Sequence, residues 1–203
     1  MDWMDEDAGR LTSTETGQAD SSAAARGNVR AALVVAALAA GFALIPRATR
    51  GCEGAALDED APNFTAPIVA NGENLGTEGS PPASLELRSL RGRPIVLDFW
   101  ATWCGPCQAE APIINALALR YKDKGLAVVG VNTSDESGLA ERFARKKGLS
   151  FPIVYDENNT IAKQYGITSM PTLVVVSKTG KIVAVRRGVT SDSALDEIVR
   201  RYL

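Results

Sequence analysis

The chain has 203 residues, of which 45% are hydrophobic and 23% are charged, as in an ordinary globular protein rather than a disordered or collagen-like one. Its 22 Lys and Arg against 24 Asp and Glu give a net charge of −2, without the basic excess that is typical of nucleic-acid binding. The absence of His excludes Ser-His-Asp triads, Cys-His proteases and His-ligated metal or haem sites. We therefore expect no nucleic-acid partner, and proton transfer must use carboxylates or thiols.

Three segments precede the folded domain, which we expect at residues 61–203. Residues 1–30 are polar, and we expect them to form a disordered tail. Residues 31–46 hold fifteen consecutive apolar residues with arginines on both sides. Fifteen apolar residues are short for a spanning helix, which needs about 20, and this length also suits the apolar core of a cleaved signal segment. We expect a transmembrane anchor, with a cleaved signal segment or a buried soluble helix as alternatives. Residues 47–60 are expected to form a linker.

The domain is predicted to begin with two short strands, at residues 64–69 and 84–87, which suit an N-terminal β-hairpin added to a sheet edge. Residues 95–100, with the sequence IVLDFW, predict a much clearer buried strand. A helix over residues 104–121 follows, because apolar residues recur there at four-residue spacing. A strand followed directly by a helix begins an α/β unit.

The rest of the domain continues the alternation of strands and helices. Apolar runs predict strands, and amphipathic spacing bounded by Gly, Asn and Asp predicts helices. In chain order we expect a strand at 126–132, a helix at 136–147, a strand at 151–155, a short helix at 158–165, paired strands at 172–177 and 182–187, and a helix at 192–202. Gly166 can end the short helix, and Asp192 can cap the last one. This order predicts an α/β fold.

Cys104 and Cys107 are the candidate chemical centre. They are separated by two residues where the expected strand turns into the helix, so they can form a disulfide with little backbone change. Unpaired N–H groups and the helix dipole favour a thiolate at the helix start, which makes Cys104 the expected nucleophile and Cys107 the shielded residue that resolves a mixed disulfide. Zinc would need two more ligands, but the chain has no His and only Cys52 besides this pair. We therefore expect no metal, and no cofactor other than the redox-active disulfide.

The residues around this pair resemble the thioredoxin superfamily. The segment from Phe99 to Cys107, FWATWCGPC, is similar to the superfamily's active site. Glu110 and Pro112 continue it like the CxxE-P extension of the TlpA/ResA-like membrane-tethered thioredoxins, and residues 61–65, APNFT, resemble that group's APxF segment. The resemblance covers the whole expected domain. It implies a thioredoxin fold with an N-terminal β-hairpin extension and a central αβ insertion, preceded by a membrane anchor or signal segment.

Further site residues follow from the resemblance, position by position. Met170 and Pro171 match the superfamily's cis-proline segment, whose backbone pairs with the substrate chain. Asp98 matches the buried acid of thioredoxin that relays a proton to the resolving cysteine, and Glu110 matches the acid of the TlpA/ResA-like group. Many members of that group have Asn at the Asp98 position. The resemblance therefore leaves open which of the two acids takes the proton from Cys107.

Several of these residues also have a plainer interpretation. Burial of a carboxylate in an apolar strand costs free energy, and such groups are often found at functional sites. This favours a functional role for Asp98. Glu110 can instead be a solvated acid that the helix dipole favours. Trp103 can be a packing residue, but a Trp that precedes the cysteine resembles the family's exposed contact residue. That interpretation places Trp103 at the substrate, together with Gly105 and Pro106.

The resemblance implies an enzyme, namely a protein-disulfide oxidoreductase. A thiol-disulfide domain that follows an apolar segment is expected beyond the membrane. We therefore predict a single-pass protein of the bacterial cytoplasmic membrane with its catalytic domain on the periplasmic or external face, or else a secreted periplasmic protein. The expected partners are the lipid bilayer through residues 31–46, a membrane thiol-disulfide electron relay, and oxidised clients such as apocytochrome c. Cys52 departs from a lipid-attachment site, because Thr49 and Arg50 stand where apolar and small residues are expected.

The direction of electron flow is predicted from the residues between the cysteines. Gly105 and Pro106 place no cation beside the nucleophile, which favours a reducing, thioredoxin-like potential. A disulfide oxidant or isomerase with the same residues is the main alternative. A peroxidase fits less well, because the turn reads WCGPC where peroxiredoxins carry a Thr-x-x-Cys pattern. A copper-binding assembly factor is a further alternative, but such proteins normally add a His and wider Cys spacing.

Overall fold

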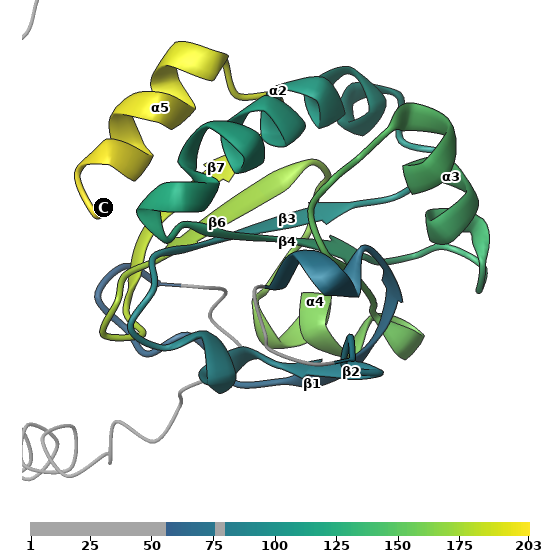
Figure 1. Cartoon of the computed structure of the whole chain (residues 1–203), viewed down its shortest axis with the longest axis horizontal. Helices are drawn as coiled ribbons and strands as arrows, with labels where there is room; N and C mark the ends of the chain where they lie inside the picture. The colour runs from purple at the N-terminus through teal and green to yellow at the C-terminus, as the bar shows by residue number, and fades with distance from the viewer. Residues whose placement is uncertain (1–55, 76–79) are drawn as a thin grey trace, which may run out of the picture. The chain divides into compact units, whose positions relative to one another are not determined.

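The computed structural model describes residues 56–75 and 80–203, whose path is shown in Figure 1. The expected N-terminal tail, the apolar segment at residues 31–46 and Cys52 lie outside the described residues. Within the part of the chain that is described, no helix is long and apolar enough to cross a membrane. The expectations about an anchor, a signal segment and lipidation therefore stay predictions.

A seven-stranded mixed sheet forms the centre of the domain. Its strands are β1 (Thr65–Ala70), β2 (Ser84–Glu86), β3 (Ile95–Trp100), β4 (Ala127–Asn132), β5 (Ile153–Tyr155), β6 (Thr172–Val176) and β7 (Ile182–Arg187). They lie in the order β2-β1-β5-β4-β3-β6-β7. β3 pairs parallel with β4 and antiparallel with β6, and all six of its residues are buried. The IVLDFW segment therefore forms the buried strand that its sequence predicted.

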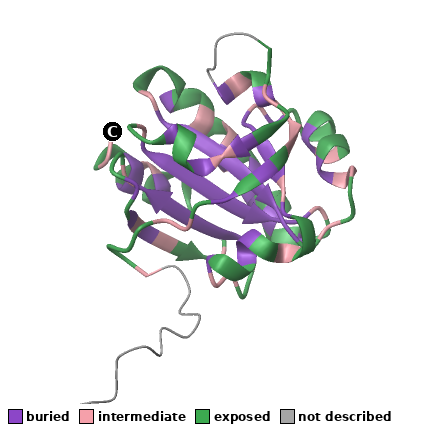
Figure 2. Cartoon of the chain, turned by 90° about the horizontal axis from the view of Figure 1, so that it is seen from below, coloured by how far each residue is buried: buried purple, intermediate pink, exposed green. Residues whose placement is uncertain are grey.

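Helices cover both faces of this sheet (Figure 1). They are α2 (Gly105–Tyr121), α3 (Leu139–Lys147), α4 (Thr160–Gln164) and α5 (Asp192–Arg200). Side chains of β3 alternate between the two faces. Val96 and Trp100 belong to a core with residues of α2, α3 and α5, whereas Leu97 and Phe99 belong to a second core with residues of α4. The strands are consequently buried between two layers, as Figure 2 shows.

The hairpin and the insertion that the resemblance implies are both present. β1 pairs antiparallel with β2 and with β5, so the two N-terminal strands extend one edge of the sheet. α3 and β5 lie in the chain between β4 and β6, and β5 pairs parallel with β4. The domain therefore has the thioredoxin-like α/β fold, with the β-hairpin extension and the αβ insertion that were predicted.

The end of the expected linker lies against the opposite edge of the sheet. Asp60 forms an isolated antiparallel bridge with Lys181. The backbone N–H of Asp58 donates to the Ile182 carbonyl at 2.9 Å, and the Ile182 N–H donates to the Glu59 carbonyl at 2.9 Å. Residues 58–60 thus pair with the start of β7. The folded domain therefore begins a few residues before residue 61, where we expected it to start.

The start of α3 and the cap of α5 differ from the prediction. α3 begins at Leu139 rather than at residue 136, directly after Gly138 adopts a left-handed conformation with φ of 81°. The cap of α5 is Ser191, whose Oγ accepts a hydrogen bond from the Ala194 backbone N–H at 3.3 Å. The prediction of Asp192 as the cap is therefore wrong, because the preceding Ser occupies that position and Asp192 is the first helical residue.

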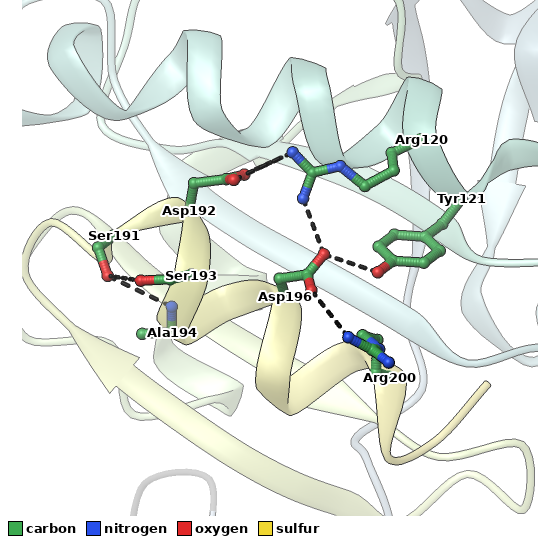
Figure 3. A network of polar contacts seen from close by, with 8 residues as sticks. All are labelled: Arg120, Tyr121, Ser191, Asp192, Ser193, Ala194, Asp196 and Arg200. Carbon is green, nitrogen blue, oxygen red and sulfur yellow. Dashed lines mark hydrogen bonds and ion pairs between the residues drawn. The ribbon is translucent and has the colours of Figure 1, made fainter.

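A polar network joins α5 to the C-terminal turn of α2 (Figure 3). Arg120 of α2 contacts Asp192 at 3.0 Å and Asp196 at 2.7 Å. The Tyr121 hydroxyl donates to Asp196 at 2.6 Å, and Arg200 lies 3.9 Å from the same carboxylate. The hydrogen bonds from Tyr121 and Arg120 stabilise the charged carboxylate and hold the pKa of Asp196 below its usual value. The network lies at the opposite end of α2 from the cysteine pair, so it secures α5 without entering the site.

Candidate active site

Cys104 and Cys107 form a disulfide at the start of α2, with an S–S distance of 2.05 Å and a Cα–Cα distance of 5.2 Å. Cys104 is the N-cap residue of the helix, and its Sγ accepts a hydrogen bond from the Cys107 backbone N–H at 3.2 Å. Its carbonyl accepts another from the Gln108 N–H at 3.0 Å. Pro106 lies in the first turn, where an N–H would have no helical partner. The pair lies where the sequence predicted it, at the turn from β3 to α2.

The start of α2 distinguishes the two cysteines chemically. In the disulfide form the Sγ of Cys104 accepts the Cys107 N–H at the positive end of the helix dipole, and a thiolate at the same place in the reduced protein would be stabilised by both. Both effects favour the thiolate, the form that attacks disulfides. The exposed fractions differ little in the disulfide form, at 6% for Cys104 and 4% for Cys107. Position on the helix, rather than exposure, therefore supports Cys104 as the nucleophile.

Asp98 is a buried acid on the face of the sheet that α2 covers. Its chain neighbours Leu97 and Phe99 point to the core on the α4 side, so the Asp98 side chain points to the opposite face. On the adjacent strands it pairs with Gly130 and Leu173. Its Oδ1 has no hydrogen-bond partner among the described residues. Burial, followed by the charge of Glu110, raises the pKa of Asp98 well above its usual value. Asp98 therefore holds a proton more readily than an exposed Asp does.

Glu110 is buried as well, with 1% of the residue exposed. Its Oε1 accepts the backbone N–H of Thr190 at 2.6 Å, whereas its Oε2 has no partner among the described residues. Burial raises the pKa of Glu110, and the hydrogen bonds from Thr190 partly oppose this rise. Glu110 is therefore a buried acid, which removes the plainer interpretation of a solvated residue at the start of the helix.

Asp98 and Glu110 form an electrostatically coupled pair. A negative charge on Glu110 disfavours the ionisation of Asp98, and each side chain has one oxygen without a partner among the described residues. Two buried carboxylates with so few donors ionise together only at a high cost in free energy, so the pair favours retaining a proton. A buried group that exchanges a proton beside α2 is what a resolving cysteine needs.

Trp103 is an exposed aromatic residue rather than part of the core, with 63% of the residue accessible to solvent. Its indole N–H donates to the Ser134 carbonyl at 2.8 Å. The preceding residue, Thr102, is held by the carboxylate of Asp135, which accepts its N–H at 2.6 Å and its hydroxyl at 2.8 Å. Trp103 thus presents a large aromatic surface directly next to Cys104 in the chain.

The Met170–Pro171 peptide bond is cis, as the resemblance implies. Thr172, the next residue, pairs with Phe99 of β3, so this segment lies near the end of β3 that leads to the cysteines. The Pro171 carbonyl accepts the N–H of Gly188 at 2.8 Å. Met170 is half-buried and packs against the core that contains both cysteines. The cis-proline segment therefore lies at the end of the sheet where β3 leads into the cysteine turn.

Gly105 and Pro106 complete the turn between the cysteines, and both are exposed. Neither residue adds a charge beside the sulfurs. In the described ranges, no group of three or more His, Cys, Asp or Glu side chains is placed to hold a metal ion.

Three residues at the site carry no signal in the sequence. Thr190 donates its backbone N–H to Glu110, a bond that any residue except Pro could make, so the residue type at this position does not predict it. Asp135 and Asn159 are hydrogen-bonded to residues of other loops. These contacts join positions between 25 and 80 residues apart, and no local motif marks them.

Comparison with known proteins places the whole described domain among thiol-disulfide exchange proteins. A family model described as Redoxin matches residues 56–199. The thiol-disulfide oxidoreductase ResA of Halalkalibacterium halodurans is 36% identical over 116 residues, which cover 57% of this chain and 66% of the relative. The ResA of Bacillus anthracis is 31% identical over 151 residues, covering 74% of this chain and 81% of the relative.

A solved structure agrees with these sequence matches. The crystal structure of a thiol:disulfide interchange protein assigned as DsbE, from Chlorobium tepidum, superposes with a TM-score of 0.63 at 28% sequence identity. The match covers 72% of this chain and 97% of that one. The likeness therefore spans almost the entire neighbouring protein.

Proposed function

Because the chain belongs to the redoxin family and is a TlpA/ResA-like thiol-disulfide oxidoreductase of the thioredoxin type, we propose that it reduces disulfide bonds of envelope proteins through Cys104 and Cys107. The observation that carries this proposal is the N-cap position of Cys104, where the Cys107 N–H and the helix dipole favour a thiolate. The buried acids Asp98 and Glu110 supply a proton acceptor on the same side of the sheet.

The reaction consists of two exchange steps. The Cys104 thiolate attacks one sulfur of the client disulfide, which forms a mixed disulfide and releases the first client thiolate. Cys107 then transfers its proton to the Asp98–Glu110 pair and attacks the Sγ of Cys104, which releases the second client thiolate. The client gains two electrons, its thiolates are protonated by solvent and by the acid pair, and the protein ends with the Cys104–Cys107 disulfide.

The client chain is proposed to bind across the exposed turn of the cysteines. Trp103, Gly105 and Pro106 are exposed at this turn. Met170 and Pro171 directly precede β6, whose first residue, Thr172, pairs with Phe99 near the end of β3 that leads to the turn. An extended client segment that contacts both places its disulfide at Cys104.

The direction of electron flow is proposed to be reductive. Potentials of CxxC proteins span about 150 mV, or roughly 7 kcal/mol for two electrons, and a more strongly stabilised thiolate makes the protein more oxidising. Gly105 and Pro106 add no cation beside Cys104, so the thiolate is stabilised mainly by the helix start. This moderate stabilisation supports a potential near the reducing end of the range.

We further propose that the domain works outside the cytoplasm, as a single-pass membrane protein or in secreted form. The apolar segment at residues 31–46 supports this location. A membrane thiol-disulfide relay would return the protein to its dithiol form. Apocytochrome c is a proposed client, because its cysteines must be reduced before haem attachment, and other oxidised envelope proteins fit the same chemistry. A disulfide oxidant or isomerase with the same site is the alternative, followed by a copper-binding assembly factor.

Titration of the full-length protein against a dithiol redox buffer tests the direction of transfer. We expect the Cys104–Cys107 pair to have a potential closer to about −270 mV, as in thioredoxin, than to about −120 mV, as in the strong oxidant DsbA. The Cys52→Ser variant is the matched control and should give the same value, because it retains the pair. A potential near that of the oxidant would make disulfide formation the leading function.

A further inference from the structure

The loop that follows β4, residues 133–135, supports the turn that precedes Cys104. The Asp135 carboxylate binds the backbone and side chain of Thr102, and the Ser134 carbonyl binds the indole of Trp103. The Tyr155 hydroxyl donates to the Asp135 carbonyl at 3.0 Å, which ties the loop to the end of β5. Because Trp103 is largely exposed, its hydrogen bond to Ser134 fixes the ring where packing does not.

Ser134 adopts a backbone conformation that needs support. Its φ is 56°, in the left-handed region that residues other than Gly rarely adopt. The Asn159 side chain provides this support, because its Oδ1 accepts the Ser134 N–H at 2.7 Å and the Ser134 hydroxyl at 3.2 Å. The same oxygen accepts the Thr133 hydroxyl at 2.8 Å. Without these bonds, Ser134 is free to relax to a commoner conformation and turn its carbonyl away from Trp103.

Asn159 lies in the segment between β4 and β6, which contributes no reacting group. It precedes α4 as its N-cap residue, with φ of 56°, a conformation that Asn tolerates better than most residues. Its side chain makes no cap hydrogen bond to α4. The Oδ1 is directed instead to the loop after β4, and through Ser134 to the surface beside Cys104.

We propose that Asn159 is a positioning residue for the docking of client proteins, which holds Ser134 so that its carbonyl orients the Trp103 indole beside Cys104. The inference rests on the proposed function, in which Cys104 exchanges disulfides with proteins. Trp is enriched among the residues that dominate protein binding energy. A ring that is already ordered in the free protein loses less conformational entropy when a partner binds.

The size of the disulfide substrate separates this role from a general effect on the site. A protein substrate extends beyond its sulfurs and contacts the surface around Cys104, including Trp103. A minimal substrate such as hydroxyethyl disulfide needs only access to the sulfur. Disordering of Trp103 is therefore expected to slow the reaction with proteins and to spare the reaction with the small disulfide.

Two substitutions of Asn159 form a matched pair in the full-length protein. Asn159→Gly permits the positive φ and removes the acceptor, whereas Asn159→Asp keeps an acceptor oxygen and tolerates the same backbone conformation. The measurement is the second-order rate constant for oxidation of the reduced protein by insulin and by hydroxyethyl disulfide. We expect Asn159→Gly to lower the insulin rate about tenfold and the hydroxyethyl disulfide rate by less than about twofold, with Asn159→Asp close to wild type.

A double-mutant cycle shows whether Asn159 acts through Trp103. Trp103→Ala should lower the insulin rate by itself, and Asn159→Gly added to it should cause no further loss. Should Asn159→Gly fail to fold, Trp103→Phe keeps an aromatic side chain, smaller than the indole, and removes the N–H that binds Ser134. In that variant the ratio of the insulin rate to the hydroxyethyl disulfide rate should fall below the wild-type ratio, and an unchanged ratio would count against the inference.

Equal losses with both disulfides, no loss with insulin, or a further loss in the Trp103→Ala background would overturn the inference. The wild-type rate with insulin tests the proposed function separately, because the inference concerns the ratio of variant to wild type. If electrons flow in the opposite direction, the same ratios are measured with the oxidised protein and reduced insulin, since docking serves both directions.

Discussion

Replacing Cys107 with Ser is expected to leave the protein able to attack client disulfides and unable to release the client. Cys104 keeps its position at the start of α2 and forms the mixed disulfide, but no second thiol remains to displace the client. Covalent complexes should therefore accumulate and should disappear when a reductant is added. Cys104→Ser is expected to lower disulfide reduction to the uncatalysed rate, because the thiolate that starts the reaction is lost.

Nonreducing gel electrophoresis of cell extracts, after acid quenching of free thiols, measures these complexes. The Cys52→Ser substitution in the Cys107→Ser background is the matched control and should still trap clients, since it removes the third cysteine and keeps Cys104. If Cys104→Ser accumulates complexes and Cys107→Ser does not, Cys107 is the nucleophile and the argument from the helix start fails.

Asp98→Asn and Glu110→Gln are expected to slow the second exchange step and to leave the first unchanged. Loss of a proton acceptor lowers the rate of such a step by about 10²-fold or more. In the wild type the second step should accelerate as pH rises through the raised pKa values of the two acids, because only an ionised carboxylate takes the proton from Cys107. Glu110→Gln also removes the charge that raises the pKa of Asp98. In this variant the pH midpoint of the second exchange step should therefore move to lower pH.

The buried acid Asp98 is also expected to make the oxidised protein less stable as pH rises. Its pKa is higher in the folded than in the unfolded protein, so the folded state retains a proton that the unfolded state releases. The resulting stabilisation is fully present below the unfolded pKa of about 3.9 and is lost as pH rises through the folded value. Asp98→Asn removes this dependence, so its urea midpoint should fall less between about pH 5 and pH 9.

Stopped-flow mixing of the reduced protein with a disulfide resolves the two steps, and urea denaturation over a pH series gives the stability. Glu141→Gln is the matched control, because this acid is exposed on α3 and contacts Arg145 of the same helix. A slower first step in the acid variants, or pH profiles identical to wild type, would contradict a role of the pair in proton transfer.

The β3–α2 region shows how much of the fold and site local sequence can predict. An apolar run interrupted only by Asp98 predicts a buried strand, and the cysteine spacing after it predicts a helix start that holds a disulfide. Both predictions are confirmed because each depends on residues that are neighbours in the chain. The burial of Asp98 follows directly from its place in that strand.

Contacts between distant loops could not be predicted in this way. Ser and Asp are both good N-cap residues, so local chemistry does not decide between Ser191 and Asp192. In the structure Ser191 is the cap, and Asp192 instead contacts Arg120 of α2. The contact between Thr190 and Glu110 depends on which backbone N–H the fold places near the acid. Such pairings are set by tertiary packing, which local patterns do not contain.

Electron transfer from the reduced full-length protein to an oxidised apocytochrome c tests the central claim most directly. After mixing in equal amounts, alkylation of free thiols and mass spectrometry report which partner holds the disulfide. We predict that the Cys104–Cys107 disulfide forms while the cysteines of the apocytochrome become open to alkylation. Retention of the apocytochrome disulfide, or transfer of the disulfide from the oxidised protein to a reduced apocytochrome, would contradict the proposed reductase.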